Sequence, residues 1–143
     1  MKRNIILIVL LFCLIGANIV CRPGVSTPPS LIPIPGSLIA RWTLTDIQSA
    51  GTGGPGVWSV ANPPGQWMDI QPAGQISGTA FPNATGYQVI DSLTLKVIDP
   101  SQSAGFRLFA YHVDTAARAL FFYIRPPGGV ACIEGCGGYR FGR

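Results

Sequence analysis

The sequence predicts an all-β fold, a single eight-stranded up-and-down antiparallel β-barrel. Three observations predict it. From residue 37 to the end, apolar and polar side chains alternate with a period of two over short stretches, which is typical of half-buried strands. Clusters rich in proline, glycine and asparagine separate these stretches. No stretch between them is suited to a crossover helix, so parallel strands, which need crossover connections of about a dozen residues, are not expected.

The expected strands follow one another along the chain at hairpin spacing. They are residues 38–45, 66–70, 75–80, 87–90, 92–98, 106–113, 119–124 and 139–141. In the first strand, Leu38, Ala40, Trp42 and Leu44 alternate with polar residues. Because successive side chains of a strand point to opposite faces, these four are expected to face the core.

Turn-forming residues separate the strands. A glycine-rich loop over 49–56 follows the first strand, and the cluster 62–65 precedes the second. Residues 71–74 have proline at the second position and glycine at the fourth, which favours a β-turn joining the second and third strands. The run 126–129 (PPGG) ends the seventh strand.

Closure into a barrel removes the two exposed edges that a flat sheet would leave. The interior of an eight-stranded barrel is just wide enough for side chains, or for one small ligand. Both a packed core and a small apolar pocket fit the sequence. The residues expected to fill or line the interior are Leu93, Leu95, Val97, Phe106, Leu108, Leu120 and Phe122. Trp58 and Trp67, which flank a proline-rich loop, are expected at the mouth of such a pocket.

Residues 1–21 predict a secretory signal peptide. Lys2 and Arg3 form a basic start, and 5–17 is an uncharged apolar run of 13 residues. This run is shorter than the roughly 20 residues of a membrane-spanning helix. The alternative is a permanent anchor helix, against which Asn18 interrupts the apolar run.

Cys21 is expected to carry a lipid. The segment 18–21 (NIVC) resembles a bacterial lipobox, and a diacylated cysteine holds a protein on a membrane because each buried CH₂ contributes about 0.8 kcal/mol. Residues 22–36, with five prolines, predict an extended tether that carries a domain over 37–143. The expected location is the cell envelope, facing the periplasm or the cell surface. Cleavage after Ala17 instead would give a secreted protein.

Cys132 and Cys136 are expected to form a disulfide. Cys13 is removed with the signal and Cys21 is used by the lipid, so an even pair remains in an oxidising compartment. The small loop it closes implies a stabilisation of about 2 kcal/mol. A metal site would need more ligands than two thiolates, and His112 is the only histidine, so neither a metal nor another cofactor is expected.

Charge and side-chain chemistry argue against two function classes. The net charge of +4 includes Lys2 and Arg3, so the exported part carries +2, scattered without a basic stripe. Nucleic-acid binding is therefore not indicated. His112 and Asp114 share one face of a strand, but a Gly-x-Ser-x-Gly motif and paired carboxylates are lacking. No catalytic residue and no enzyme activity are expected.

Several segments together resemble one family. They are Trp42 within Ala-Arg-Trp-Thr-Leu, Trp58 after the glycine-rich loop, the hairpin 70–76, and Cys132-Ile-Glu-Gly-Cys136 before a strand with Arg140 and Phe141. Over residues 38–143 the chain resembles the lipocalin-like lipoproteins of bacterial cell envelopes, within the calycin group. It departs from lipocalins at Ala40, where they usually have glycine.

The resemblance implies an architecture and a location rather than a reaction. It implies that Trp42 closes one barrel end and that an arginine of the last strand lies over the indole, Arg140 or, as the alternative, Arg143. A desolvated cation–π contact of this kind contributes about 2 kcal/mol. This pair would be a structural plug and not a binding site.

The expected function is non-enzymatic binding of a small apolar or amphipathic molecule. The residues named for it are Trp58, Trp67, Leu95, Phe106, Leu108 and Phe122. The alternative is an envelope protein-interaction module, an inhibitor or assembly factor, with a packed core and binding through loops 49–56 and 126–129. A biotin-binding, avidin-like barrel is a further alternative, suggested only by the short stretch 74–79.

Overall fold

The computed structural model describes residues 32–51, 56–126, 128 and 136–143, and these form one all-β domain without a helix. All strands belong to one antiparallel sheet. The strands are β1 (Ala40–Gln48), β2 (Trp58–Val60), β3 (Trp67–Ile70), β4 (Ile76–Gly78), β5 (Gly86–Val89), β6 (Thr94–Ile98), β7 (Phe106–Asp114), β8 (Ala119–Arg125) and β9 (Gly138–Gly142). The predicted fold class is confirmed, and each of the eight expected strands has a counterpart.

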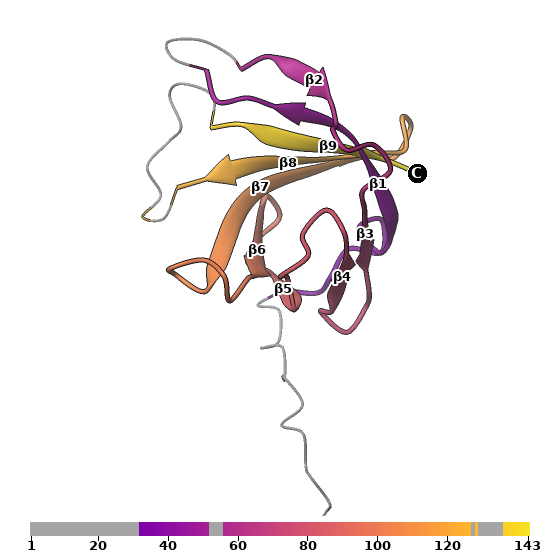
Figure 1. Cartoon of the computed structure of the whole chain (residues 1–143). Coiled ribbons are helices and arrows are strands. Elements are labelled where there is room, and N and C mark those ends of the chain that lie inside the picture. Colours follow the sequence, from indigo (N-terminus) through magenta and orange to yellow (C-terminus); the bar gives the residue numbers. More distant parts are fainter. Residues whose placement is uncertain (1–31, 52–55, 127, 129–135) are drawn as a thin grey trace, which may run out of the picture.

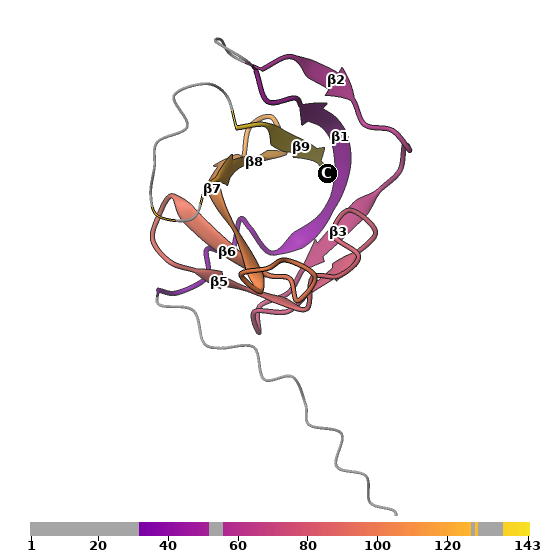
Figure 2. The same cartoon turned by 60° about the vertical axis from the view of Figure 1, so that its left-hand side comes forward.

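The sheet curls into a nearly closed up-and-down barrel (Figures 1 and 2). Eight strands follow the order β4-β3-β1-β9-β8-β7-β6-β5, so the first and last strands of the domain are neighbours. The ninth strand, β2, lies off this path and pairs with the second half of β1. The sequence alone does not predict β2 as a strand, because three residues beside a glycine-rich stretch show no readable alternation.

Tyr87 bridges the seam between the two ends of this path, β4 and β5. Its backbone N–H donates to the carbonyl of Gly74 at 2.7 Å. Its hydroxyl donates to the carbonyl of Gln71 at 2.8 Å. Both acceptors lie in the β3–β4 turn, so one buried residue of β5 ties that hairpin to the rest of the barrel.

We expect Tyr87→Phe to lower the free energy of unfolding by about 1 kcal/mol, the typical contribution of one hydrogen bond. Burial raises the pKa of Tyr87 to about 12, above its ordinary value near 10. The folded state therefore retains the phenolic proton more tightly than the unfolded state, and this contribution is complete below about pH 10 and lost as the pH rises toward 12.

Urea unfolding of both proteins between pH 8 and 11.5 measures this effect. The wild type should lose stability above pH 10 more steeply than Tyr87→Phe. Parallel loss in the two proteins would contradict a role for Tyr87 in the alkaline transition.

A bulge in β1 exchanges its inner and outer faces. The pairing of β1 with β9 shifts register between Leu44 and Asp46, which leaves Thr45 as the extra residue. Trp42 and Leu44 are buried before the bulge, and Ile47 packs against the core after it. A bulge of this kind bends the strand and re-aims its side chains, so Asp46 comes to lie on the outer face beside Arg140.

Aromatic rings fill the barrel. Phe81, from the β4–β5 connection, lies 5.7 Å from Phe109 and 5.3 Å from Tyr139, between ring centroids. Phe109 and Phe122 stack at 5.1 Å, and Phe122 meets Phe141 edge-on at 5.6 Å. Phe109, Phe122 and Phe141 are fully buried. These rings therefore pack against one another inside the barrel.

Most of the predicted interior residues face inward, and three do not. The fully buried ones are Leu95, Val97, Leu120 and Phe122. The expectation for Phe106 and Leu108 was wrong, because the core-facing positions of β7 are Phe109 and Tyr111. Both sets of alternate positions on β7 are largely apolar, so the pattern alone could not choose between its faces. Leu93 is 61% exposed because it precedes β6 and lies in the β5–β6 turn.

Trp42, which the family resemblance names as a structural plug, is fully buried near the start of β1. Its indole N–H donates to the carbonyl of Leu38 at 2.9 Å, and both residues are fully buried. The guanidinium of Arg143 lies 4.7 Å from the indole ring. Ile32 and Ile34, in the last part of the expected tether, pack against the same core.

The assignment of Arg140 to this plug was wrong, and the alternative, Arg143, is the residue over Trp42. Phe141 is buried, so its neighbour Arg140 falls on the outer face of β9, whereas Arg143, just past the end of the strand, lies over the indole of Trp42. Arg140 instead donates from Nε to Asp46 at 2.7 Å. Because side chains alternate between the two faces of a strand, Arg140 and Phe141 cannot both point inward.

Candidate functional site

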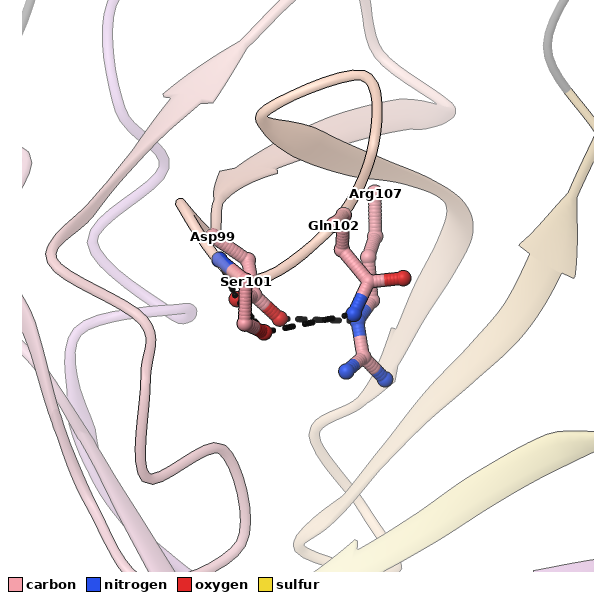
Figure 3. Close-up of polar contacts among 4 residues, drawn as sticks. All are labelled: Asp99, Ser101, Gln102 and Arg107. Atoms are coloured by element: carbon pink, nitrogen blue, oxygen red, sulfur yellow. Dashed lines mark hydrogen bonds and ion pairs between the residues drawn. The ribbon is translucent and has the colours of Figure 1, made fainter.

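A buried ion pair lies at the barrel end opposite Trp42, which we call the Phe81 end. Asp99 follows β6 and is 2% exposed. Its carboxylate accepts hydrogen bonds from the backbone N–H and the hydroxyl of Ser101. The other carboxylate oxygen accepts from Nε of Arg107 at 3.0 Å (Figure 3). The arginine also lies 5.9 Å from the Phe81 ring, so the pair covers the aromatic core at this end.

The carboxyl group of Asp99 is ionised despite its burial. Burial by itself raises its pKa, but the hydrogen bonds from Ser101 and the charge of Arg107 outweigh this, and the net pKa is lowered. All of these partners come from one short loop and the start of β7. The pair therefore fixes the β6–β7 connection over residues 99–105.

A cavity of about 280 Å³ opens beside this pair, and we call it the rim cavity. One part of its lining is apolar and another is basic. The apolar residues are Ala104, Phe106, Leu108, Ile124 and Pro126, and the polar ones are Gln102, Ser103, Arg107 and Arg125. Phe106 and Leu108 thus line a cavity after all, at the rim of the barrel and not in its interior.

A second feature is a set of aromatic side chains on the outer surface, which we call the outer aromatic face. It consists of Trp58, Phe121 and Tyr123, with His112 and Arg140 at its margin. Trp58 meets Phe121 edge-on at 6.4 Å and Tyr123 edge-on at 6.2 Å. The rings of Phe121 and Tyr123 are nearly parallel, 5° apart.

Strand register and one glycine explain how Trp58 reaches these rings. Trp58 pairs with Gln48, Gln48 with Gly138, and Gly138 with Tyr123, so these residues form one row across β2, β1, β9 and β8. A Cβ atom at Gly138 would lie 2.7 Å from the carbonyl oxygen of Phe122 and 3.2 Å from Cδ1 of Tyr123. A larger residue there would disturb this row.

The next row along the same face carries an ion pair and an exposed valine. It runs from His112 through Phe121, Arg140 and Asp46 to Val60. In the centre of this row, Nε of Arg140 donates a hydrogen bond to the carboxylate of Asp46. Val60 is 78% and Tyr123 39% exposed. A depression of about 320 Å³ beside Phe121 and Arg140 continues this surface toward the β7–β8 turn.

The backbone groups on the outer edge of β2 pair with none of the strands that the structure describes. The N–H of Ser49 donates to Val57 and the N–H of Ala61 donates to Thr45. Because hydrogen-bonded pairs alternate in an antiparallel ladder, the backbone groups of Trp58 and Val60 point away from β1. No described strand pairs with this edge of β2.

The two tryptophans predicted at a pocket mouth lie on the outside of the barrel. Trp58 belongs to the outer aromatic face. Trp67 alternates with the buried Met68 on β3, and the guanidinium of Arg41 lies 4.1 Å from its ring. The structure thus places Trp67 in a local cation–π contact, apart from Trp58.

Several residues of these sites escaped the sequence analysis. Phe121, Tyr123 and Arg125 are the outward positions of β8, and Arg107 lies on β7 beside the cavity. The segment 119–124 has aromatic residues at both its inward and its outward positions. An aromatic outer face could have been inferred from this pattern. Nothing local to the sequence indicated that β2 would lie beside β1 and extend this surface.

Some expectations fall on residues outside the described ranges. Cys21 and Cys132 both lie there, as do residues 1–31, so the lipid attachment and the disulfide between Cys132 and Cys136 stay predictions. Among the described residues, no helix is long and apolar enough to span a membrane.

His112, the one histidine of the sequence, packs on an aromatic ring of the outer aromatic face. His112 is exposed and stacks on Phe121 at 6.2 Å. Asp114 accepts a hydrogen bond from the N–H of Ala117 at 2.9 Å, which orders the β7–β8 turn. Within the described ranges, no group of three or more histidine, cysteine or acidic side chains is placed to hold a metal ion.

No protein-family model, curated protein or solved structure matches this chain. The resemblance to lipocalin-like lipoproteins therefore stays a prediction. Two features of the chain itself remain as candidate sites, the outer aromatic face with the free edge of β2, and the rim cavity.

Proposed function

We propose that the protein is a non-catalytic module of the cell envelope that binds a protein partner through its outer aromatic face and the adjacent edge of β2. The observation that carries this proposal is the placement of the aromatic side chains. One set packs inside the barrel, and a second set, with Trp58 and Tyr123, lies on the surface beside an edge of β2 that no described strand covers.

The chemistry of this surface suits an extended segment of a polypeptide. Such a segment adds a strand to an exposed sheet edge, with main-chain hydrogen bonds for affinity and side-chain contacts for specificity. The backbone groups of Trp58 and Val60 supply the bonds. Natural edge strands are usually protected by charges, whereas β2 carries tryptophan, serine and valine. Apolar side chains of the partner would rest on Trp58 and Tyr123.

The filled interior supports a protein partner over a small molecule held inside the barrel. Phe81, Phe109 and Phe122 contact one another inside the barrel and occupy space that an interior ligand would need. Tryptophan, tyrosine and arginine are the residues that dominate binding energies at protein interfaces, and all three occur on the outer face.

We further propose that the module is exported and anchored through a lipid on Cys21. The basic start, the short apolar run and the proline-rich stretch that follows support this location. The barrel would be held close to the membrane, since Ile32 and Ile34 already pack against its core and leave only a short stretch of chain after Cys21.

Site-specific photo-crosslinking tests the proposed interface. The full chain, in its native membrane, carries a benzophenone amino acid at position 123, at position 60 or, as a control on another part of the surface, at position 67. We expect one discrete adduct from positions 123 and 60 and none from position 67. Equal adducts from all three positions, or none from 123 and 60, would overturn the proposal.

Two variants at Val60 test edge pairing. Val60→Pro removes an N–H that points to the free edge, while Val60→Thr retains it. We expect the first to abolish the adduct at position 123 and the second to preserve it. An adduct insensitive to Val60→Pro would rule out strand addition.

Trp58→Ala should weaken binding by about 2 kcal/mol, roughly thirtyfold, as an interface hot spot does.

A further inference from the structure

The rim cavity is a second site, separate from the outer aromatic face. We propose that it binds a small amphipathic monoanion, an aryl carboxylate being the class that fits best. It lies at the Phe81 end, between the β6–β7 loop and the end of β8. Ligand binding in this cavity requires neither a protein partner nor a hollow barrel.

The charge of the cavity favours an anion. Arg107 and Arg125 line it, and none of its lining residues is acidic. A third cation lies close by, because the ammonium group of Lys96 is 4.4 Å from the ring of Phe106. A ligand carboxylate would thus meet positive charge without a competing carboxylate in the lining.

Both guanidinium groups keep donors for a ligand. Arg107 is held by Asp99 through Nε, and its two terminal nitrogens point away from that carboxylate in Figure 3. Arg125 donates from Nη1 to the hydroxyl of Thr94 at 3.1 Å. A guanidinium has five N–H donors, so each arginine is held in place by one bond and has others left. Planar donors of this kind suit a carboxylate.

The nearest acidic groups are already engaged. Asp99 is bonded to Ser101 and Arg107. Asp91, whose pKa is lowered mainly by a hydrogen bond from the backbone of Leu93 and to a lesser degree by the charge of Arg125, lies outside the lining. One of the two lining arginines is neutralised by Asp99, which matches a ligand with a single negative charge.

The size and the apolar lining define the rest of the ligand. Because a water molecule occupies about 30 Å³ of liquid, a cavity of about 280 Å³ holds on the order of ten non-hydrogen atoms. Phe106, Leu108 and Ile124 offer apolar surface to its body. A ring with a short acidic side chain satisfies both conditions.

Binding of phenylacetate to the full chain, measured by isothermal titration calorimetry, tests this inference. Phenylacetamide is the matched ligand, with the same number of non-hydrogen atoms and no charge. We expect phenylacetate to bind one site at least tenfold more tightly than the amide, since hydrogen bonds to charged groups are the stronger ones. Equal affinity of acid and amide, or no binding of the acid, would overturn the proposal.

Variants then assign the site. Arg125→Gln should weaken phenylacetate binding about tenfold, and Ala104→Glu, in an exposed loop of the lining, should abolish it by placing a carboxylate in the cavity. Arg118→Gln makes the same charge change in the exposed β7–β8 turn, outside the cavity, and should leave affinity unchanged. An equal loss in Arg118→Gln and Arg125→Gln would show that only net charge matters and would reject the site.

Discussion

Replacing Phe122 by alanine is expected to lower the free energy of unfolding by about 3–5 kcal/mol, which is typical of a fully buried phenylalanine. Phe122 is fully buried and contacts Phe81, Phe109 and Phe141. Its loss leaves a cavity among rigid rings that have little freedom to collapse. Since a small domain has a total stability of about 5–15 kcal/mol, this variant should be close to unfolding.

The neighbouring residue is the matched control. Phe121 points outward, where it contacts Trp58, Tyr123 and His112. Phe121→Ala should cost about 1 kcal/mol, the range of an aromatic pair on a surface, and should weaken partner binding. Urea unfolding measures both variants. Similar losses in the two would contradict the assignment of inner and outer faces on β8.

Replacing Asp99 by asparagine is expected to cost about 2 kcal/mol at neutral pH. Removing one partner of a buried ion pair leaves an unpaired charge, which costs up to about 5 kcal/mol, but Arg107 is 34% exposed and water recovers part of this. The carbonyl oxygen of the new amide would still accept a hydrogen bond from Ser101. The β6–β7 loop should exchange its amide hydrogens faster, including the N–H groups of Gln102 and Gly105 that close its turns.

The pH dependence of stability distinguishes Asp99 from a neutral packing residue. Burial raises its pKa in the folded state, but the hydrogen bonds from Ser101 and the charge of Arg107 outweigh burial, so the net pKa is lowered. The folded protein therefore binds this proton less tightly than the unfolded chain. The stabilisation is present above the unfolded pKa of about 4 and is lost as the pH falls below it.

Thermal unfolding between pH 7 and pH 2 measures this contribution. The wild type should lose stability below about pH 4, and Asp99→Asn should lose less over the same range. Ser101→Ala provides a second test, because it removes one of the hydrogen bonds that hold the carboxylate ionised while leaving the ion pair with Arg107. Identical acid transitions in wild type and Asp99→Asn would contradict the assignment.

The alternation in the sequence was sufficient for much of the barrel. Trp42 and Leu44, or Leu95 and Val97, are apolar residues separated by polar ones, and all four are buried. On such strands only one face can enter a core. The prediction failed on β7, where Phe106 and Leu108 compete with Phe109 and Tyr111, since apolar residues on both faces carry no information about direction.

The candidate sites were less predictable, because they depend on strand register. The choice between Arg140 and Arg143 as the plug over Trp42 depended on which face of β9 turns inward, and Phe141 decided it. Trp58 joins Phe121 only because β2, β1, β9 and β8 lie side by side. Residues 58 and 121 are far apart along the chain, and no local pattern connects them.

The sequence by itself determined the class of fold and the number of strands in the barrel path, because these follow from local alternation and turn chemistry. Only the tertiary structure decided that aromatic rings fill the interior, that the bulge at Thr45 turns Asp46 outward to Arg140, and that Arg107 and Arg125 share a cavity with Phe106. The physical reason is that barrel closure sets the neighbours of every side chain through long-range pairing, and pairing register is a property of two strands and not of either one.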